Sequence, residues 1–172
     1  GLMAARHLNA GDTAYDLGCS LGATTLAILQ QTTSPNVSVI GVDNAPAMIA
    51  QAREQLSDPR ARFECADLTE FAVTDAKVVV LNFVMQFLPP AARLPLLQRL
   101  RSQIRSAGLL IVSEKTRQSD ADVQKFYDST HLAWKRANGD SELEVSQKRQ
   151  SLEQVMIVDS EEIHNQRFSD AG

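Results

Sequence analysis

The sequence predicts an α/β fold built on a parallel sheet of five strands. Short apolar or β-branched runs of strand length alternate with segments that carry apolar residues at helical spacing. Strands that alternate with helices form parallel sheets with right-handed crossovers. The run Lys77–Leu81 is unbroken in apolar residues after its first, as expected for a strand that helices cover on both faces. The predicted strands are Thr13–Leu17, Val37–Val42, Arg62–Cys65, Lys77–Leu81 and Leu109–Ser113.

Helices are predicted between these strands and after them. In the helix that follows the first strand, Leu26, Ile28 and Leu29 are expected to reach the core. No further strand is predicted after Lys115, where the pattern changes to helices alone. The predicted helices are Leu2–Leu8, Ala23–Gln31, Ala45–Leu56, Ala91–Ile104, Asp120–Arg136 and Ser141–Met156, the last two joined at Asn138 and Gly139.

Length, composition and charge describe one ordinary globular domain. The chain has 172 residues, 44% of them apolar and 22% charged, with a formal net charge of -4. This acidic balance excludes the basic surface through which proteins grip nucleic acid, and no apolar run approaches the roughly 20 residues of a membrane span. The two cysteines, Cys19 and Cys65, and the three histidines lack the spacing of a disulfide framework or a metal site. We therefore expect a cytoplasmic protein without a metal, a membrane segment or direct contact with nucleic acid.

Both ends of the sequence look cut. The first residue is Gly1 rather than Met, inside a predicted helix, and the last residues, Ala171 and Gly172, directly follow another helix. We expect a fragment of a longer protein in three parts: a core at 1–115, a helical segment at 116–157 and a truncated C-terminal helix at 158–172.

A glycine turn, DLGCSLG at residues 16–22, links the first strand to the next helix. In Rossmann-like folds this turn holds a nucleotide, because glycine lets the backbone approach the ligand and the helix N-terminus offers free N–H groups. A dinucleotide site needs G-x-G-x-x-G, but Ser20 replaces the second glycine and Gly22 follows two residues later, which argues against NAD and FAD. S-adenosyl-L-methionine (SAM) has no phosphate and tolerates the serine, although a plain strand-to-helix turn remains the alternative. Cys19 has no His nearby in sequence to activate it and is predicted to be a packing residue.

Polar residues stand at the ends of the next three strands. Asp43, followed by Asn44, is placed to accept hydrogen bonds from two ribose hydroxyls, or else it caps the next helix. Asp67, followed by Leu68, is placed to accept from the exocyclic amine of adenine, although a solvated loop aspartate is the commoner case. Asn82 ends a buried strand and points into the ligand crevice of such folds, unless it bonds its own loop. Together with the glycine turn, these strand ends predict a ligand site at one edge of the sheet.

An arginine falls on the apolar face of the last predicted helix. Arg149 shares one stripe with Val145, Leu152 and Met156. A guanidinium on a buried face needs an anion, and arginine binds a carboxylate through two parallel hydrogen bonds. Arg149 is therefore a candidate carboxylate ligand, but the residues alone favour an ion pair within the chain or a side chain that reaches water.

Several runs of the sequence resemble the bacterial carboxy-SAM synthase family. The last of them is the most specific, since general methyltransferases share the glycine turn but not the later helical stretch. The resemblance spans essentially the whole chain and implies a class I methyltransferase-like fold with an added helical segment. The matching runs are YDLGCSLGATTL at Tyr15–Leu26, VDNAPAMI at Val42–Ile49, VVVLNF at Val78–Phe83, QFL at Gln86–Leu88, SEK at Ser113–Lys115 and KRANGDSELEVSQKR at Lys135–Arg149.

The resemblance implies an enzyme that is not a methyltransferase. The family takes SAM and prephenate and yields carboxy-SAM and phenylpyruvate, by a route in which prephenate loses carbon dioxide and a sulfonium ylide of SAM captures it. It also implies a homodimer, and a partner enzyme that uses carboxy-SAM to carboxymethylate a wobble uridine of tRNA. Two alternatives stay open: a conventional small-molecule methyltransferase whose helical segment is a substrate lid, and a SAM-binding fragment without turnover.

The resemblance also assigns roles to the candidate residues. It makes Arg149 the ligand of the added carboxylate and the catalytic candidate, which reverses the preference stated above. Ser106, Ala107 and Gly108 replace the family's usual Pro-Gly-Gly turn. The family's N-terminal segment with a ligand-binding tyrosine and its final antiparallel strands are absent, so we expect an exposed sheet edge. The remaining implied ligands are Gly18, Cys19 and Ser20 at the amino-acid end of SAM, Asp43 and Asn44 at the ribose, Asp67 and Leu68 at the adenine, and Asn82 near the sulfonium.

Overall fold

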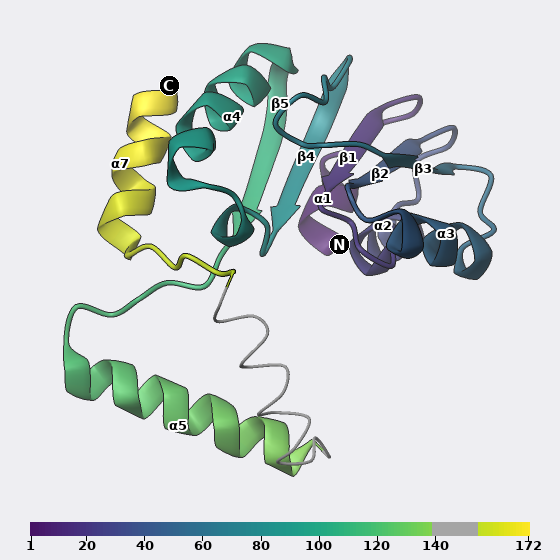
Figure 1. Ribbon diagram of the computed structural model, residues 1–172. Helices are drawn as coiled ribbons and strands as arrows, with labels where there is room; N and C mark the ends of the chain where they lie inside the picture. Colours follow the sequence, from purple (N-terminus) through teal and green to yellow (C-terminus); the bar gives the residue numbers. More distant parts are fainter. Residues whose placement is uncertain (139–154) are drawn as a thin grey trace.

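The computed structural model describes residues 1–138 and 155–172, and a parallel sheet forms its centre (Figure 1). The described residues place five strands in the order β3-β2-β1-β4-β5, which confirms the predicted α/β fold. The bounds agree with the predicted strands to within one residue, except that β5 begins earlier. The strands are β1 (Thr13–Leu17), β2 (Ser38–Asp43), β3 (Ala61–Cys65), β4 (Ala76–Asn82) and β5 (Ile104–Ser113).

Helices cover both faces of this sheet (Figure 1). Helices α1 (Leu2–Arg6), α2 (Ala23–Gln31) and α3 (Pro46–Gln55) lie on one side, and α4 (Pro90–Gln103) lies on the other. Because side chains alternate along a strand, the two central strands feed both layers of core, as predicted for a strand buried on both faces. The side chains that pack toward α4 are Tyr15, Leu17, Val79 and Leu81, and those that pack toward α1 and α2 are Ala14, Val78 and Val80.

The prediction that Leu26 of α2 belongs to the core is wrong. Leu26 is 40% exposed, whereas Ile28 and Leu29 are buried as expected. The buried stripe of α2 is completed by Thr25, which is fully buried. A polar residue at that position hid the true stripe from the apolar pattern, because Thr25 reaches the core through hydrogen bonds rather than apolar contact.

The boundary between α4 and β5 also differs from the prediction. The helix ends at Gln103, and the strand begins at once at Ile104. Ala76 of β4 pairs with Ile104, whereas Val78 pairs with Leu109, so β5 holds a large bulge between these two pairs. The turn expected before the fifth strand is therefore part of the strand itself.

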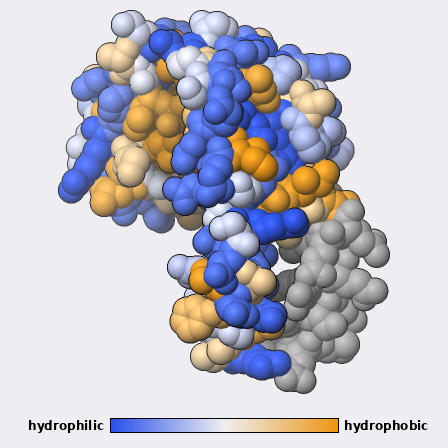
Figure 2. All heavy atoms as spheres, turned by 90° about the vertical axis from the view of Figure 1, so that its left-hand side faces the viewer, coloured by the Kyte–Doolittle hydropathy of each residue, from blue (hydrophilic) through white to orange (hydrophobic). Residues whose placement is uncertain are grey.

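After the sheet the chain is helical. Helix α5 (Ala121–Ala137) lies within one residue of its predicted bounds, and α7 (Glu161–Ala171) packs against α4. All but the last two residues of the predicted helix Ser141–Met156 fall outside the described part of the chain. Figure 1 shows α5 apart from the sheet and its helices, and Figure 2 shows hydrophilic and hydrophobic side chains mixed on its surface. None of the helices in residues 1–138 and 155–172 is both long and apolar enough to cross a membrane.

Candidate functional site

The predicted site residues gather at the carboxyl ends of the strands. The strand order reverses direction at β1, which lies between β2 and β4. In open α/β sheets, ligands bind in the crevice outside the carboxyl ends of the strands at such a switch point. Gly18, Asp43, Asp67 and Asn82 all follow or end strands at this edge.

The glycine turn after β1 is shaped by two positions that require glycine. Gly18 has φ +77, and its amide donates to the carbonyl of Val42 at 2.7 Å. A Cβ at Gly18 would stand 2.4 Å from Cγ2 of Val84, so no side chain fits between the turn and β4's following loop. Gly22, with φ +82, is the N-cap of α2. At both positions the turn packs so closely against its neighbours that a side chain has no room.

Asp16 fixes the start of α2 from inside the sheet. Its Oδ2 accepts from the amide of Thr25 at 2.9 Å and from the hydroxyl of Thr25 at 2.8 Å. Burial raises the pKa of Asp16 to about 6, although both hydrogen bonds from Thr25 act in the opposite direction. The sequence reasoning missed this residue, although a carboxylate inside an apolar strand just before the glycine turn was the available signal.

Asp43 is not the N-cap residue of α3, but it binds the amide of that residue. The N-cap of that helix is Ala45, which has no side-chain cap hydrogen bond. Asp43 instead accepts from the amide of Ala45 through Oδ1 at 3.0 Å and from the amide of Ser20 through Oδ2 at 2.9 Å. Asp43 therefore binds an amide at the start of α3 without being its N-cap residue, and it also joins the end of β2 to the glycine turn after β1. Asn44 follows it and is exposed.

Asp67 and Leu68 lie just beyond β3 and differ in exposure. Oδ1 of Asp67 accepts from the hydroxyl and the amide of Thr69, both at 2.7 Å, and these two bonds lower the pKa of Asp67. Leu68 is buried in the core that faces α4. The guanidinium of Arg99 binds the carbonyls of Leu68 and Thr69, which anchors this loop to α4. The exposed carboxylate of Asp67 thus lies on a loop that Arg99 of α4 holds in place.

Asn82 reaches across the edge rather than into its own loop. Its Nδ2 donates to Oγ1 of Thr24 in the first turn of α2 at 3.4 Å. Asn82 is exposed and so remains accessible at the switch point. The loop-bonding alternative is not what the structure shows for this amide.

Cys19 is buried, as predicted for a packing residue. It packs with Ile49, Ala52 and Phe63 between the turn and α3. Burial, together with the negative charges of Asp16 and Asp43, raises the pKa of the Cys19 thiol to about 12. A thiol of such high pKa is not a nucleophile at neutral pH.

Glu114 belongs to this edge and was not singled out from the residues. It directly follows β5, and its carboxylate accepts from three successive amides after β4: Val84 at 2.9 Å, Met85 at 2.7 Å and Gln86 at 3.2 Å. The signal that identified Asp43 and Asn82, a polar residue at a strand end, applies to Glu114 as well.

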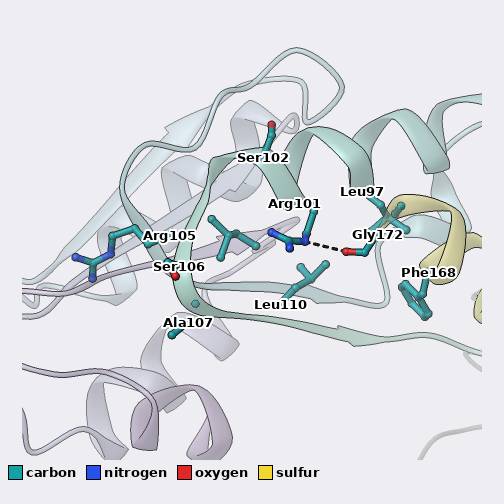
Figure 3. A pocket seen from close by; sticks show the side chains of 12 residues that line it. Leu97, Arg101, Ser102, Arg105, Ser106, Ala107, Leu110, Phe168 and Gly172 are labelled. Carbon is teal, nitrogen blue, oxygen red and sulfur yellow. Dashed lines mark hydrogen bonds between the residues drawn. The ribbon is translucent and has the colours of Figure 1, made fainter.

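Arg149, the candidate carboxylate ligand and catalytic residue, is outside the described residues. A hollow of about 660 Å³ lies at the opposite, amino-terminal end of β5, between α4 and α7 (Figure 3). There Arg101 binds the carbonyl of Gly172 at 2.8 Å, with Phe168 and Leu110 nearby. The lining of this hollow includes no predicted site residue. We therefore place the candidate site at the carboxyl ends of the strands.

Comparison with known proteins defines the class. The family described as "Methyltransferase domain" matches residues 14–108, more than half of the chain. A solved S-adenosylmethionine-dependent methyltransferase from Mesorhizobium loti shares the fold, with a TM-score of 0.55 and 20% identity over 62% of this chain and 48% of that one. The fold and its glycine turn are therefore those of a class I methyltransferase-like domain.

Two curated relatives narrow the class to one family. Both are carboxy-S-adenosyl-L-methionine synthases, from Geobacter metallireducens at 48% identity and from Trichlorobacter lovleyi at 47%. Each match spans 100% of this chain and 72% of the relative. The chain belongs to the carboxy-S-adenosyl-L-methionine synthase family.

Proposed function

We propose that this chain converts SAM and prephenate into carboxy-SAM and phenylpyruvate. The observation that carries the proposal is 48% identity to a carboxy-SAM synthase along the entire chain. In this reaction prephenate loses carbon dioxide and its ring hydroxide to become phenylpyruvate. The methyl group of SAM loses a proton, its carbon bonds the carbon dioxide, and the proton and hydroxide leave as water. The protein's own contribution is to bind and orient the two molecules, since positioning alone can account for a large share of a rate enhancement.

The strand-end carboxylates have acceptor positions left for a nucleoside. A carboxylate offers about four acceptor positions, and Asp43 uses two of them on Ser20 and Ala45. The other two suit the two ribose hydroxyls. Asp67 uses only Oδ1 on Thr69, so Oδ2 can accept from the exocyclic amine of adenine. These side chains therefore fit the adenosine part of SAM.

The remaining ligand contacts follow the glycine turn and β4. In this proposal Gly18, Cys19 and Ser20 line the amino-acid end of SAM. Leu68 and Asn44 extend the adenine and ribose contacts. Asn82, which donates to Thr24, is proposed to face the sulfonium.

Arg149 is the proposed ligand of the new carboxylate. A guanidinium binds a carboxylate in bidentate fashion and would discriminate carboxy-SAM from SAM. In this proposal residues 1–115 form the SAM-binding core, 116–157 carry Arg149, and 158–172 pack against the core.

The proposed setting is the cytoplasm, with the protein as a homodimer. Its product would pass to a tRNA carboxymethyltransferase that modifies a wobble uridine. The net charge of -4 suits an enzyme that makes the reagent and leaves the grip on tRNA to its partner.

The test of the activity is mass spectrometry of the chain incubated with SAM and prephenate. We expect a product heavier than SAM by one carboxyl group, with an equal amount of phenylpyruvate. If a folded chain that binds SAM leaves it unchanged, the synthase proposal fails. Methylation of an added small molecule would then favour a conventional methyltransferase, and no turnover of any kind would favour a SAM-binding fragment.

The test of the carboxylate role is Arg149→Ala, with Lys148→Ala as the matched control in the same segment. Loss of a bidentate, charge-assisted pair should weaken carboxy-SAM binding by about tenfold or more and SAM binding far less. Calorimetric titration with each ligand measures both. Equal weakening for both ligands would contradict the role given to Arg149.

A further inference from the structure

The loop that follows β4 is held by a side chain from the neighbouring strand. Helix η1 (Met85–Phe87) opens this loop, and its N-cap, Val84, provides no side-chain cap. The carboxylate of Glu114 takes that place, since it accepts from the amides of Val84, Met85 and Gln86. A carboxylate is the strongest acceptor for such free amides, because its bonds are charge-assisted and the N-terminal end of a helix attracts negative charge.

The same loop begins with a strained residue. Phe83 has φ +59 and is 50% exposed, between Asn82 and Val84. A bulky residue in this left-handed region is an outlier that persists only where its surroundings enforce it. The enforcing contacts come from the end of β5: Ser113 accepts from the amide of Phe83 at 2.7 Å, and Glu114 binds the next three amides.

The loop in turn bears on the glycine turn. Val84 is buried, and its Cγ2 lies 2.4 Å from the position that a Cβ of Gly18 would occupy. The side chain of Val84 therefore rests directly on the backbone of Gly18. Asn82, at the start of the loop, contacts Thr24 just beyond the same turn. A shift of this loop must move Val84 and Asn82 relative to the glycine turn.

We propose that Glu114 is a positioning residue for ligand binding. It acts through the Val84–Gln86 amides to set Val84 against Gly18 and to hold Asn82 at the switch point. This inference rests on the proposed function only in taking SAM as the ligand of the glycine turn. It adds a residue that does not touch SAM and that controls the shape of the surface that does.

The first test replaces Glu114 with glutamine and measures the Kd for SAM by calorimetry, at a temperature where circular dichroism shows the protein folded. Glutamine keeps one acceptor oxygen and turns an NH₂ group toward at least one amide donor. SAM affinity should fall about tenfold, the effect expected for losing a charge-assisted hydrogen bond. Glu54→Gln, an exposed carboxylate on α3, is the control and should bind as the parent does. A Glu114→Gln protein that binds SAM as the parent does would overturn the inference.

A double-variant cycle separates positioning from a general loss of structure. Val84→Ala removes the contact with Gly18 but leaves the amide bonds to Glu114 intact. If Glu114 acts through Val84, the combined variant should lose no more SAM affinity than the weaker-binding single variant. Losses that add would overturn the pathway through Val84.

Two arms keep the result decisive. If Glu114→Gln fails to fold, Glu114→Asp takes its place, since it retains the charge and draws the oxygens back by one methylene. Glu114→Asp should bind SAM more weakly than the parent, and an unchanged Kd overturns the inference. SAM binding requires neither prephenate nor turnover. A chain that binds SAM but makes no carboxy-SAM therefore refutes the proposed function and leaves the role of Glu114 to be decided by the Kd values. A parent chain that binds no SAM refutes both.

Discussion

The two halves of the sheet hold their polar groups in different ways. On the side of β2 and β3, the carboxylates bind backbone amides: Asp43 and Asp67 each bind the amide two residues on, and Asp43 also binds that of Ser20. On the side of β4 and β5, the contacts join segments far apart in sequence. Glu114 binds an amide 30 residues away, and Arg93 binds a carboxylate 66 residues away.

The long-range half centres on a fully buried arginine. Arg93, on α4, is 0% exposed and binds the carboxylate of Asp159 and the carbonyls of Leu88 and Ile157. Asp159 also accepts from Arg167 of α7 at 2.6 Å. Burial alone would raise the pKa of Asp159, but the hydrogen bonds from Arg167 and Arg93 together lower it. The comparison teaches that this half depends on buried pairs of opposite charge, whereas the carboxylates at the strand ends of the other half bind backbone amides.

The largest expected effect follows from removing the shared carboxylate of the long-range half. Asp159→Asn removes the negative charge that two guanidinium groups share, one of them fully buried. Breaking a buried ion pair by removing one partner costs about 3–5 kcal/mol, and we expect that loss in the free energy of unfolding. Chemical denaturation at neutral pH measures it.

The matched control is Asp58→Asn, which breaks a local pair. Asp58 and Arg60 are two residues apart and form an ion pair whose side chains are partly exposed. Exposed pairs contribute about 0–1 kcal/mol, so this variant should stay close to the parent. Equal losses for the two variants would contradict the difference drawn between the halves.

The next effect concerns a contact that is local in sequence but buried. The pKa of Asp16 is raised to about 6 by burial, above its unfolded value of 3.8. Between these pH values the folded state binds more protons than the unfolded state, so stability falls as pH rises through this range. Relative to Asp16→Asn, which does not titrate, the parent should lose up to about 3 kcal/mol of unfolding free energy between pH 4 and pH 7. Denaturation of both proteins across this range measures the difference, and a constant difference would show that Asp16 titrates normally.

Local patterns explain why much of the fold could be predicted. The alternation of strands and helices fixed the sheet, and the unbroken run Val78–Leu81 gave its most buried strand. Helix α2 was placed at its observed bounds, but Leu26 was assigned to the core because Thr25 looked polar. The apolar pattern does not show that the buried carboxylate of Asp16 accepts a hydrogen bond from the hydroxyl of Thr25.

The candidate site was predictable to the same extent. Asp43, Asp67 and Asn82 end strands, and the sheet topology brings such ends together without further information. Glu114 could have been found by the same rule. The role of Arg93 could not be predicted. Its partners Asp159 and Ile157 are more than 60 residues further along the chain, and the sequence around Arg93 does not indicate them.

A small change in stability, and the clearest change in binding, is expected for Asp43. In Asp43→Asn one of the two amides, Ser20 or Ala45, loses its acceptor, so the free energy of unfolding should fall by about 1 kcal/mol. If Asp43 also accepts from the ribose, SAM affinity should fall by about tenfold as well, because those bonds are charge-assisted. A SAM analogue that lacks one ribose hydroxyl sharpens the test: the parent should already bind it weakly, and Asp43→Asn should weaken it further by a smaller factor than it weakens SAM. If the variant weakens SAM and the analogue by the same factor, Asp43 serves only to join β2 to the glycine turn, and the ribose must be held by another residue.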